Sequence, residues 1–90
     1  MDPNRLKGKN ILITGAARGM GEANAHSFAA QGANVCVGDL DLETAQAVAD
    51  AINAAGNGKA IAVKMDVTKR EDNASAVAAT VEAFGSINVG

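Results

Sequence analysis

The chain has 90 residues, enough for one small domain, and a formal net charge of -2 with both signs interspersed. This balance predicts no polybasic surface for nucleic acid or anionic lipid, and no apolar run approaches the roughly 20 residues that a membrane helix needs. The N-terminus has no apolar core of the signal-peptide kind and a single cysteine cannot form an internal disulfide, so we expect a soluble, cytoplasmic protein.

The first predicted elements are a strand and a helix. Residues 10–14 form a short run that ends at Gly15, and its apolar residues on both faces are typical of a buried parallel strand. Residues 19–31 predict a helix, and Gly32 stands where a C-cap glycine belongs. The apolar stripe expected on this helix comprises Met20, Ala23, Ser27 and Phe28.

A second strand and a second helix follow. Residues 34–38 predict another buried strand. Asp41 can cap the next helix, which residues 56–58 break. The apolar residues at helical spacing are Leu42, Ala45, Val48, Ala49, Ile52 and Ala55.

The third repeat of the pattern begins with a strand over residues 60–63, which is expected to end near Met65. Thr68 and Glu71 have capping-box spacing ahead of a helix that Gly85 ends. The apolar face expected on this helix comprises Ala74, Val77, Val81 and Phe84. Residues 86–90 resemble the start of a fourth strand.

Strands that alternate with helices of this length imply right-handed crossovers and a parallel sheet with helices on both faces. We therefore predict an α/β fold, a three-layer partial Rossmann arrangement with a doubly wound parallel sheet. It is a βαβαβα half-fold with a truncated fourth strand, and residues 1–90 form one dinucleotide-binding half-domain.

Three glycines join the first strand to the first helix in the spacing G-x-x-x-G-x-G: Gly15, Gly19 and Gly21. At a helix N-terminus backbone N–H groups lack partners and the helix dipole adds positive charge, so a pyrophosphate fits where no Cβ blocks it. Gly15 would make the tight turn, Gly19 would admit the phosphates, and Gly21 would let helix and strand pack. The alternative is a glycine-rich turn that binds nothing. The segment lacks the Gly-Lys-Ser/Thr of a P-loop, which argues against ATP hydrolysis.

Asp39 follows the second strand directly. A carboxylate at that place can accept hydrogen bonds from both hydroxyls of an adenosine ribose and would repel a 2′-phosphate, which favours NAD over NADP. Arg18 opposes this preference, because a cation in the glycine loop could pair with a 2′-phosphate. The alternative role for Asp39 is a helix N-cap, for which Asp41 is also available.

Asp66 and Val67 follow the third strand, at the edge of the sheet where open α/β folds bind ligands. Asp66 could accept a bond from an adenine amino group while Val67 packs on the ring. Taken alone, Asp66 is better read as an ordinary aspartate between strand and loop.

These positions together resemble the short-chain dehydrogenase/reductase family. The matching residues are Thr14-Gly15-x-x-x-Gly19-x-Gly21, Asp39 after the second strand and Asp66-Val67 after the third. The resemblance implies a parent enzyme that moves hydride between NAD(P) and an alcohol or carbonyl. It also implies that the Met20 amide donates to the pyrophosphate. Asp39 and Leu40 would then hold the ribose, and Asp66 and Val67 the adenine.

The chain departs from that family in its catalytic groups. The family's chemistry uses a serine and a Tyr-x-x-x-Lys pair, with the tyrosine as acid and base, and this chain contains no tyrosine. We therefore expect no catalytic residue here, and no grouping of residues predicts a metal site.

Four further reactive side chains are expected to have no role in chemistry. His26 follows Glu22 by four residues on a helix and is predicted to lie on the surface. Cys36 lies mid-strand as a small core residue. Lys59 and Lys64 flank the third strand as solvated ends.

In a full doubly wound sheet the first strand is central, so here its open edge is expected to mediate homo-oligomer formation. The favoured interpretation is a cofactor-binding fragment of an NAD-dependent dehydrogenase. The alternatives are a non-catalytic or self-associating nucleotide-binding module, which an engineered truncation could also produce, and an interaction protein whose glycine loop binds nothing.

Overall fold

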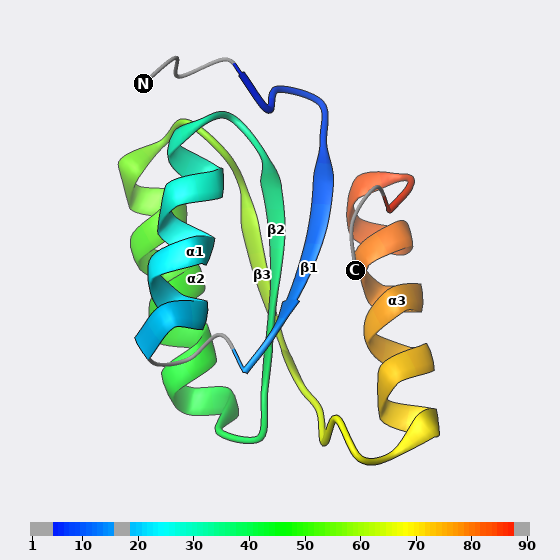
Figure 1. Cartoon of the computed structure of the whole chain (residues 1–90). Coiled ribbons are helices and arrows are strands. Elements are labelled where there is room, and N and C mark those ends of the chain that lie inside the picture. Colours follow the sequence, from blue (N-terminus) through cyan, green and yellow to red (C-terminus); the bar gives the residue numbers. More distant parts are fainter. Residues whose placement is uncertain (1–4, 16–18, 88–90) are drawn as a thin grey trace.

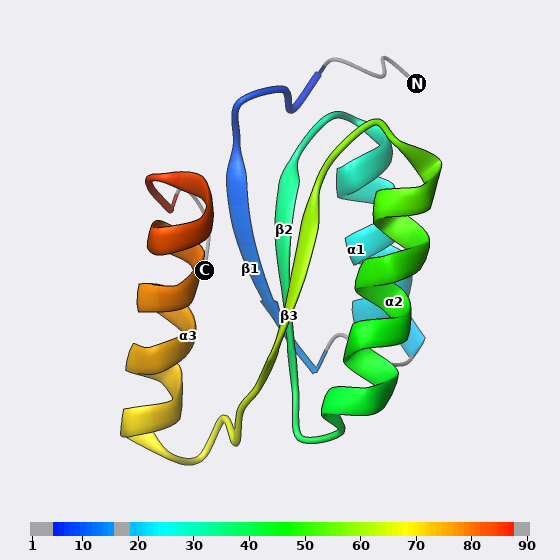
Figure 2. The same ribbon diagram turned by 180° about the vertical axis from the view of Figure 1, so that it is seen from behind.

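The computed structural model describes residues 5–15 and 19–87. Within them three strands alternate with three helices, and the strands form one parallel sheet in the order β1-β2-β3. The elements are β1 (Asn10–Thr14), α1 (Gly19–Ala30), β2 (Asn34–Asp39), α2 (Leu42–Ala55), β3 (Ala60–Lys64) and α3 (Arg70–Phe84). Helices α1 and α2 cover one face of the sheet and α3 covers the other (Figure 1, Figure 2). The predicted three-layer, doubly wound fold is confirmed.

The predicted strand bounds differ little from the structure. β1 has the predicted limits and β2 continues one residue further, to Asp39, while β3 ends at Lys64, next to the predicted end near Met65. Ser86 and Ile87 do not belong to a strand, and the rest of the predicted fourth strand lies outside the described residues. In the part of the chain that the structure describes, β1 is therefore an edge strand with β2 as its one neighbour.

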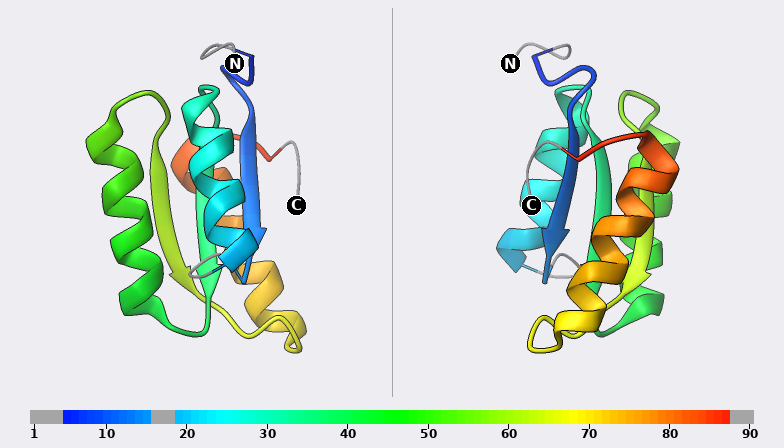
Figure 3. Two further views of the ribbon diagram at one scale, coloured as in Figure 1. Left: turned by 60° about the vertical axis from the view of Figure 1, so that its left-hand side comes forward. Right: turned by 90° about the vertical axis from the view of Figure 1, so that its right-hand side faces the viewer.

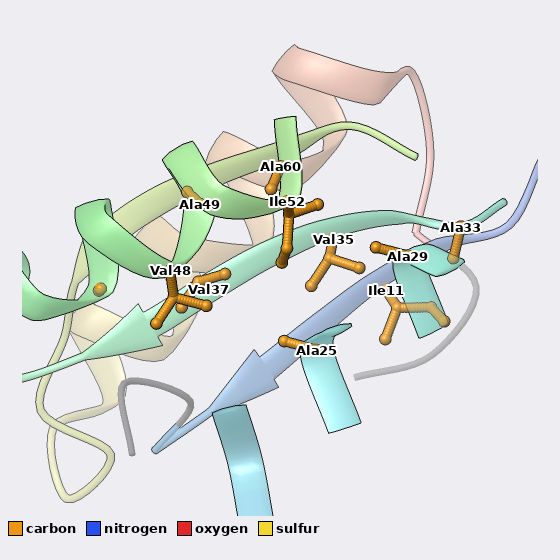
Figure 4. Close-up of a cluster of buried hydrophobic side chains, with 11 residues drawn as sticks. Ile11, Ala25, Ala29, Ala33, Val35, Val37, Val48, Ala49, Ile52 and Ala60 are labelled. Atoms are coloured by element: carbon orange, nitrogen blue, oxygen red, sulfur yellow. The ribbon is translucent and has the colours of Figure 1, made fainter. Parts of the chain in front are cut away.

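The face under α1 and α2 holds the larger of two buried clusters (Figure 4). Small residues of α1 allow this helix to approach the sheet closely, and branched side chains of β2 and α2 fill the space between them. The cluster consists of Ile11, Ala25, Ala29, Ala33, Val35, Val37, Ala45, Val48, Ala49, Ile52 and Ala60.

The stripe predicted for α1 is wrong at Met20 and Ala23, which are exposed, whereas Ser27 is half-buried and Phe28 packs against the larger cluster. The fully buried residues of this helix are Ala25 and Ala29. The centre of the α2 prediction is confirmed, but Leu42 and Ala55, at its two ends, are exposed.

The face under α3 holds a smaller cluster of Leu12, Cys36, Met65 and Ala76. The right-hand view of Figure 3 looks onto this face and shows α3 in front of the sheet. The stripe predicted for α3 was wrong, because the residues it buries are Ala76 and Thr80 while Val77 and Val81 are exposed. Thr80 tolerates burial because its hydroxyl donates to the carbonyl of Ala76 at 2.8 Å.

The capping box predicted for α3 was also wrong. The helix begins at Arg70 with Lys69 as its N-cap, and this cap makes no side-chain hydrogen bond within the described structure. The Thr68 hydroxyl donates to the Asp66 carboxylate instead, at 2.6 Å. The prediction for α2 is confirmed, since Asp41 caps that helix by accepting from the N–H of Thr44 at 3.1 Å.

Asparagine side chains at the first residues of β1 and β2 connect the sheet to the C-terminal end of α3. The Asn10 amide donates to the carbonyl of Phe84 at 3.3 Å and to the hydroxyl of Ser86 at 3.0 Å. The Asn34 amide donates to the side-chain oxygen of Asn10 at 3.0 Å. The C-terminal end of α3 is thus bonded to β1 through the buried side chain of Asn10. Among the described helices none is both long and apolar enough to cross a membrane.

Candidate functional site

The carboxyl ends of the three parallel strands lie at the same end of the sheet, the lower end in Figure 1. We call this end the carboxyl edge, as distinct from the side of the sheet formed by the edge strand β1. Thr14 pairs with Gly38, and Asp39 pairs with Lys64. The N–H of Met65 donates to the carbonyl of Asp39 at 2.9 Å. The segments that follow β1, β2 and β3 therefore start side by side, and these segments carry the site residues predicted from the sequence.

The glycine segment after β1 uses conformations that suit glycine. Gly15 has φ 63° and Gly19 has φ 61°, both in the left-handed region that side chains with a Cβ rarely adopt. Among the described residues, and apart from the chain neighbours of each glycine, no atom lies within 4 Å of where a Cβ would stand on Gly15 or Gly19. Arg18 lies outside the described residues. Gly21 is half-buried in the first turn of α1.

Asp39 is the last residue of β2, directly before the segment that leads to α2. Its Oδ1 accepts a hydrogen bond from the N–H of Asp41 at 3.0 Å. Asp41 is the N-cap of α2, so the alternative in which Asp39 caps that helix is wrong. Asp39 is half-buried and the side chain of Leu40 is 62% exposed.

The segment after β3 is a turn that carries Asp66 and Val67. The Asp66 Oδ1 accepts from the N–H of Thr68 at 2.9 Å and from the Thr68 hydroxyl at 2.6 Å. These bonds, the hydroxyl first, and the positive charge of Lys69 hold the pKa of Asp66 below its ordinary value against a smaller opposing effect of desolvation. The carboxylate thus stays ionised with one oxygen fixed in the turn.

An exposed apolar side chain also follows each of the three strands. Met20, Leu40 and Val67 are 81%, 62% and 54% exposed, and each follows a different strand. Large apolar side chains left in water beside polar groups are typical of ligand-binding surfaces. This end of the sheet therefore carries two glycines with positive φ beside the start of α1, two carboxylates and three exposed apolar side chains. That set suits a ligand with an anionic centre and a flat, partly apolar ring.

Two residues that bond the third segment were not predicted. Asp72 and Asn73, in the first turn of α3, form hydrogen bonds to the backbone of the turn that carries Asp66 and Val67. Short polar side chains near a helix start often bond nearby backbone groups, and that tendency is the signal that could have suggested them.

The other reactive side chains lie as predicted. His26 is half-exposed, with its Nε2 3.8 Å from the Glu22 carboxylate. Cys36 is a buried free thiol whose pKa is raised by burial, partly offset by a hydrogen bond with Thr80. Lys59 and Lys64 are exposed. In residues 5–15 and 19–87 no group of His, Cys, Asp and Glu is placed to hold a metal ion.

Comparison with known proteins agrees with this arrangement. The family model for short chain dehydrogenase matches residues 9–89. A 2,5-dichloro-2,5-cyclohexadiene-1,4-diol dehydrogenase of Sphingobium indicum is 50% identical over 84 residues, which cover 93% of this chain and 33% of that protein. An uncharacterized oxidoreductase of Bacillus subtilis is 51% identical over 82 residues, covering 90% of this chain and 12% of its own length.

A solved structure gives the same result for the fold. The hydroxysteroid dehydrogenase of Escherichia coli matches with a TM-score of 0.91 and 33% identity, over 98% of this chain and 37% of that one. The chain thus spans about a third of the length of the Sphingobium relative and of this structural neighbour.

Proposed function

The chain belongs to the short-chain dehydrogenase family, and we propose that its carboxyl edge binds the adenosine diphosphate part of a nicotinamide dinucleotide. One observation carries the proposal: the glycine turn, Asp39 and the Asp66–Val67 turn follow three neighbouring parallel strands at the same edge. In open α/β folds this edge is where ligands bind.

The pyrophosphate would bind at the start of α1. Gly15 and Gly19, both at positive φ, carry no side chain to block the phosphates, and the amides at the start of α1, including that of Met20, would donate to the phosphate oxygens. Gly21, in the same turn of the helix, would allow close packing against the strand. Arg18 belongs to the same segment and would add positive charge.

The adenosine ribose would bind at the end of β2, with Asp39 accepting from its hydroxyls and Leu40 beside it. The carboxylate would oppose a 2′-phosphate by roughly 1 to 4 kcal/mol at about 4 Å, depending on local dielectric. That corresponds to a preference for NAD over NADP of about fivefold to several-hundredfold.

The adenine would bind at the turn after β3. Asp66 would accept from the exocyclic amino group, and the exposed side chain of Val67 would pack on the ring. The pKa of Asp66 is lowered, so its carboxylate is available as an acceptor at neutral pH.

We propose hydride transfer between NAD and an alcohol or carbonyl as the activity of the whole protein. When bound, the nicotinamide supplies or accepts the hydride. The residues of this chain contribute cofactor binding rather than the reacting acid and base, since the sequence holds no tyrosine.

Isothermal titration with ADP, NAD and NADP tests the proposal. We expect ADP to bind with a Kd on the order of 0.1 to several mM, and NAD to bind more tightly than NADP. Asp39→Asn should weaken the binding of NAD and reduce the difference in affinity between NAD and NADP, because it removes the charge that opposes the 2′-phosphate. The control is Asp50→Asn on the exposed surface of α2, which should change neither. Absence of heat with ADP at millimolar concentration would disprove the proposal.

A second proposal is that two copies associate through β1. This strand is the edge of the described sheet, and a long apolar edge with one side unpaired favours association. Sedimentation velocity over a wide concentration range should show a rise in mass, and a constant monomer mass would contradict it.

A further inference from the structure

Two side chains of α3 bond the backbone of the turn that carries Asp66 and Val67. The N–H of Asp66 donates to Oδ2 of Asp72 at 2.8 Å. The Asn73 amide donates to the carbonyl of Val67 at 3.0 Å and to that of Lys69 at 3.1 Å. The backbone is therefore bonded to α3 immediately before Asp66 and immediately after Val67, on both sides of the two side chains assigned to the adenine.

The bond from Asp72 differs from an ordinary helix cap. An acidic residue at the third position of a helix normally bonds the N–H of the N-cap residue, which here is Lys69. The N–H of Lys69 donates instead to the carbonyl of Asp66 at 2.9 Å. Asp72 reaches past the cap to Asp66, six residues earlier in the chain, so its bond holds the turn and not the end of the helix.

Packing does little to hold the turn. The side chain of Val67 is 54% exposed, and the Asp66 carboxylate bonds Thr68 within the turn itself. The turn is tied to the sheet where the N–H of Met65 meets the carbonyl of Asp39 at 2.9 Å. Beyond Met65, the described bonds that fix its place relative to α3 are the side-chain bonds of Asp72 and Asn73 and the backbone bond from Lys69 to Asp66.

We propose that Asp72 and Asn73 are positioning residues for the adenine end of the nucleotide site. They hold the turn so that the Asp66 carboxylate and the Val67 side chain face the ring before the ligand arrives. A turn ordered in advance lowers the cost of binding, because the ligand does not have to immobilise it. The inference rests on the proposed function.

The test compares two carboxylates in one helical turn. Asp72→Ala removes the bond to Asp66, and Glu71→Ala removes an exposed neighbouring charge as a matched control. We expect Asp72→Ala to weaken ADP by about three- to tenfold, the range expected when a loop must be ordered on binding. Under the proposed function inorganic pyrophosphate would bind at the start of α1 and not at the turn after β3, so its affinity should not change. Glu71→Ala should leave both ligands unchanged.

A conservative variant separates positioning from folding. Asp72→Asn keeps an acceptor oxygen and should restore most of the affinity for ADP, and Asn73→Ala should repeat the selective loss. In nitrogen–proton NMR spectra the amide signal of Asp66 should move in Asp72→Ala and stay in Glu71→Ala, since charge-assisted bonds shift the amide proton strongly.

Three outcomes would overturn the inference. The first is an equal loss of affinity for ADP and for pyrophosphate in Asp72→Ala, which would show a change in the whole domain. The second is unchanged ADP affinity although the Asp66 signal moves, which would show that the turn needs no positioning. The third is a wild-type chain that binds no ADP, a result that removes the proposed function itself and this inference with it.

Discussion

The two faces of the sheet are packed to different degrees. Under α1 and α2, eleven buried side chains form one cluster, and Val35 and Val37 of the central strand are fully buried (Figure 4). Under α3 the buried cluster has four members, and that helix leaves Val77 and Val81 each 39% exposed. Two helices cover the first face and one covers the second, so the first supplies most of the hydrophobic stabilisation.

The difference extends to the candidate site. The segments with the glycines and Asp39 lead into α1 and α2, whose positions are fixed by packing on the filled face. The turn with Asp66 leads into α3, whose ends are held by hydrogen bonds: Asn10 at the C-terminal end, Asp72 and Asn73 at the start. Directional polar bonds can thus position an element that packing holds weakly, at the cost of depending on a few side chains.

Adjacent residues of β1 give the strongest test of this comparison. Ile11 and Leu12 are both 5% exposed and point to opposite faces. We expect Ile11→Ala to lower the free energy of unfolding by about 3 to 5 kcal/mol, and Leu12→Ala by about 2 to 3, because the thinner face can collapse into the space left behind. Urea denaturation followed by circular dichroism measures both values.

The pair serves as its own control, because each substitution removes the same number of carbon atoms from one strand. Equal losses, or a larger loss for Leu12→Ala, would mean that the two faces contribute alike despite their different clusters.

Substituting each of two glycines by alanine tests the same contrast between the faces, because each substitution adds a Cβ atom. A Cβ on Gly58 would overlap the backbone oxygen of Ala33, on the side of α1 and α2, whereas one on Gly38 would overlap the side chain of Met65 on the α3 side. Backbone cannot move aside but a methionine can repack. We expect Gly58→Ala to cost about 3 kcal/mol and Gly38→Ala about 1. Thermal unfolding of the two variants measures this, and a reversed order would refute the view of the α3 face as adaptable.

The strands and the α2 face could be predicted from the sequence because their apolar residues contrast with their surroundings. Val48 and Ile52 stand out at helical spacing and are buried. The faces of α1 and α3 could not, since both helices are rich in alanine and a small residue serves equally on either side. The prediction therefore followed the large side chains, Met20 and Val77 among them, and these proved to be exposed.

The same limit applies to the candidate site. The ends of the strands placed Asp39 and Asp66 at one edge from pattern alone, because parallel strands carry their carboxyl ends together. The bonds that orient them are of another kind. Whether Thr68 serves as a cap or bonds Asp66, and whether Asp72 bonds its own helix or the turn before it, depends on a few ångströms of backbone path that spacing does not encode.

The smallest expected effect is on the pKa of Asp66, in the turn that leads into α3. Thr68→Ala removes the hydroxyl that contributes most to the lowered pKa of Asp66, so this pKa should rise toward its ordinary value. The rise should be incomplete, because the N–H of Thr68 and the charge of Lys69 remain. A carbon NMR titration of the Asp66 carboxyl measures it. Thr44→Ala, which removes the corresponding hydroxyl from Asp41 at the start of α2, should leave the titration of Asp66 unmoved.

The sign of the linked effect on stability follows from that pKa. A carboxyl whose pKa is lowered in the folded state stabilises the fold above its unfolded pKa and loses that contribution as the pH falls through the folded pKa. Thr68→Ala should therefore reduce the part of the acid-induced destabilisation that Asp66 causes. An unchanged pKa in this variant would mean that the hydroxyl does not hold the carboxylate. The turn would then depend on α3 alone, which would make the loss caused by Asp72→Ala larger.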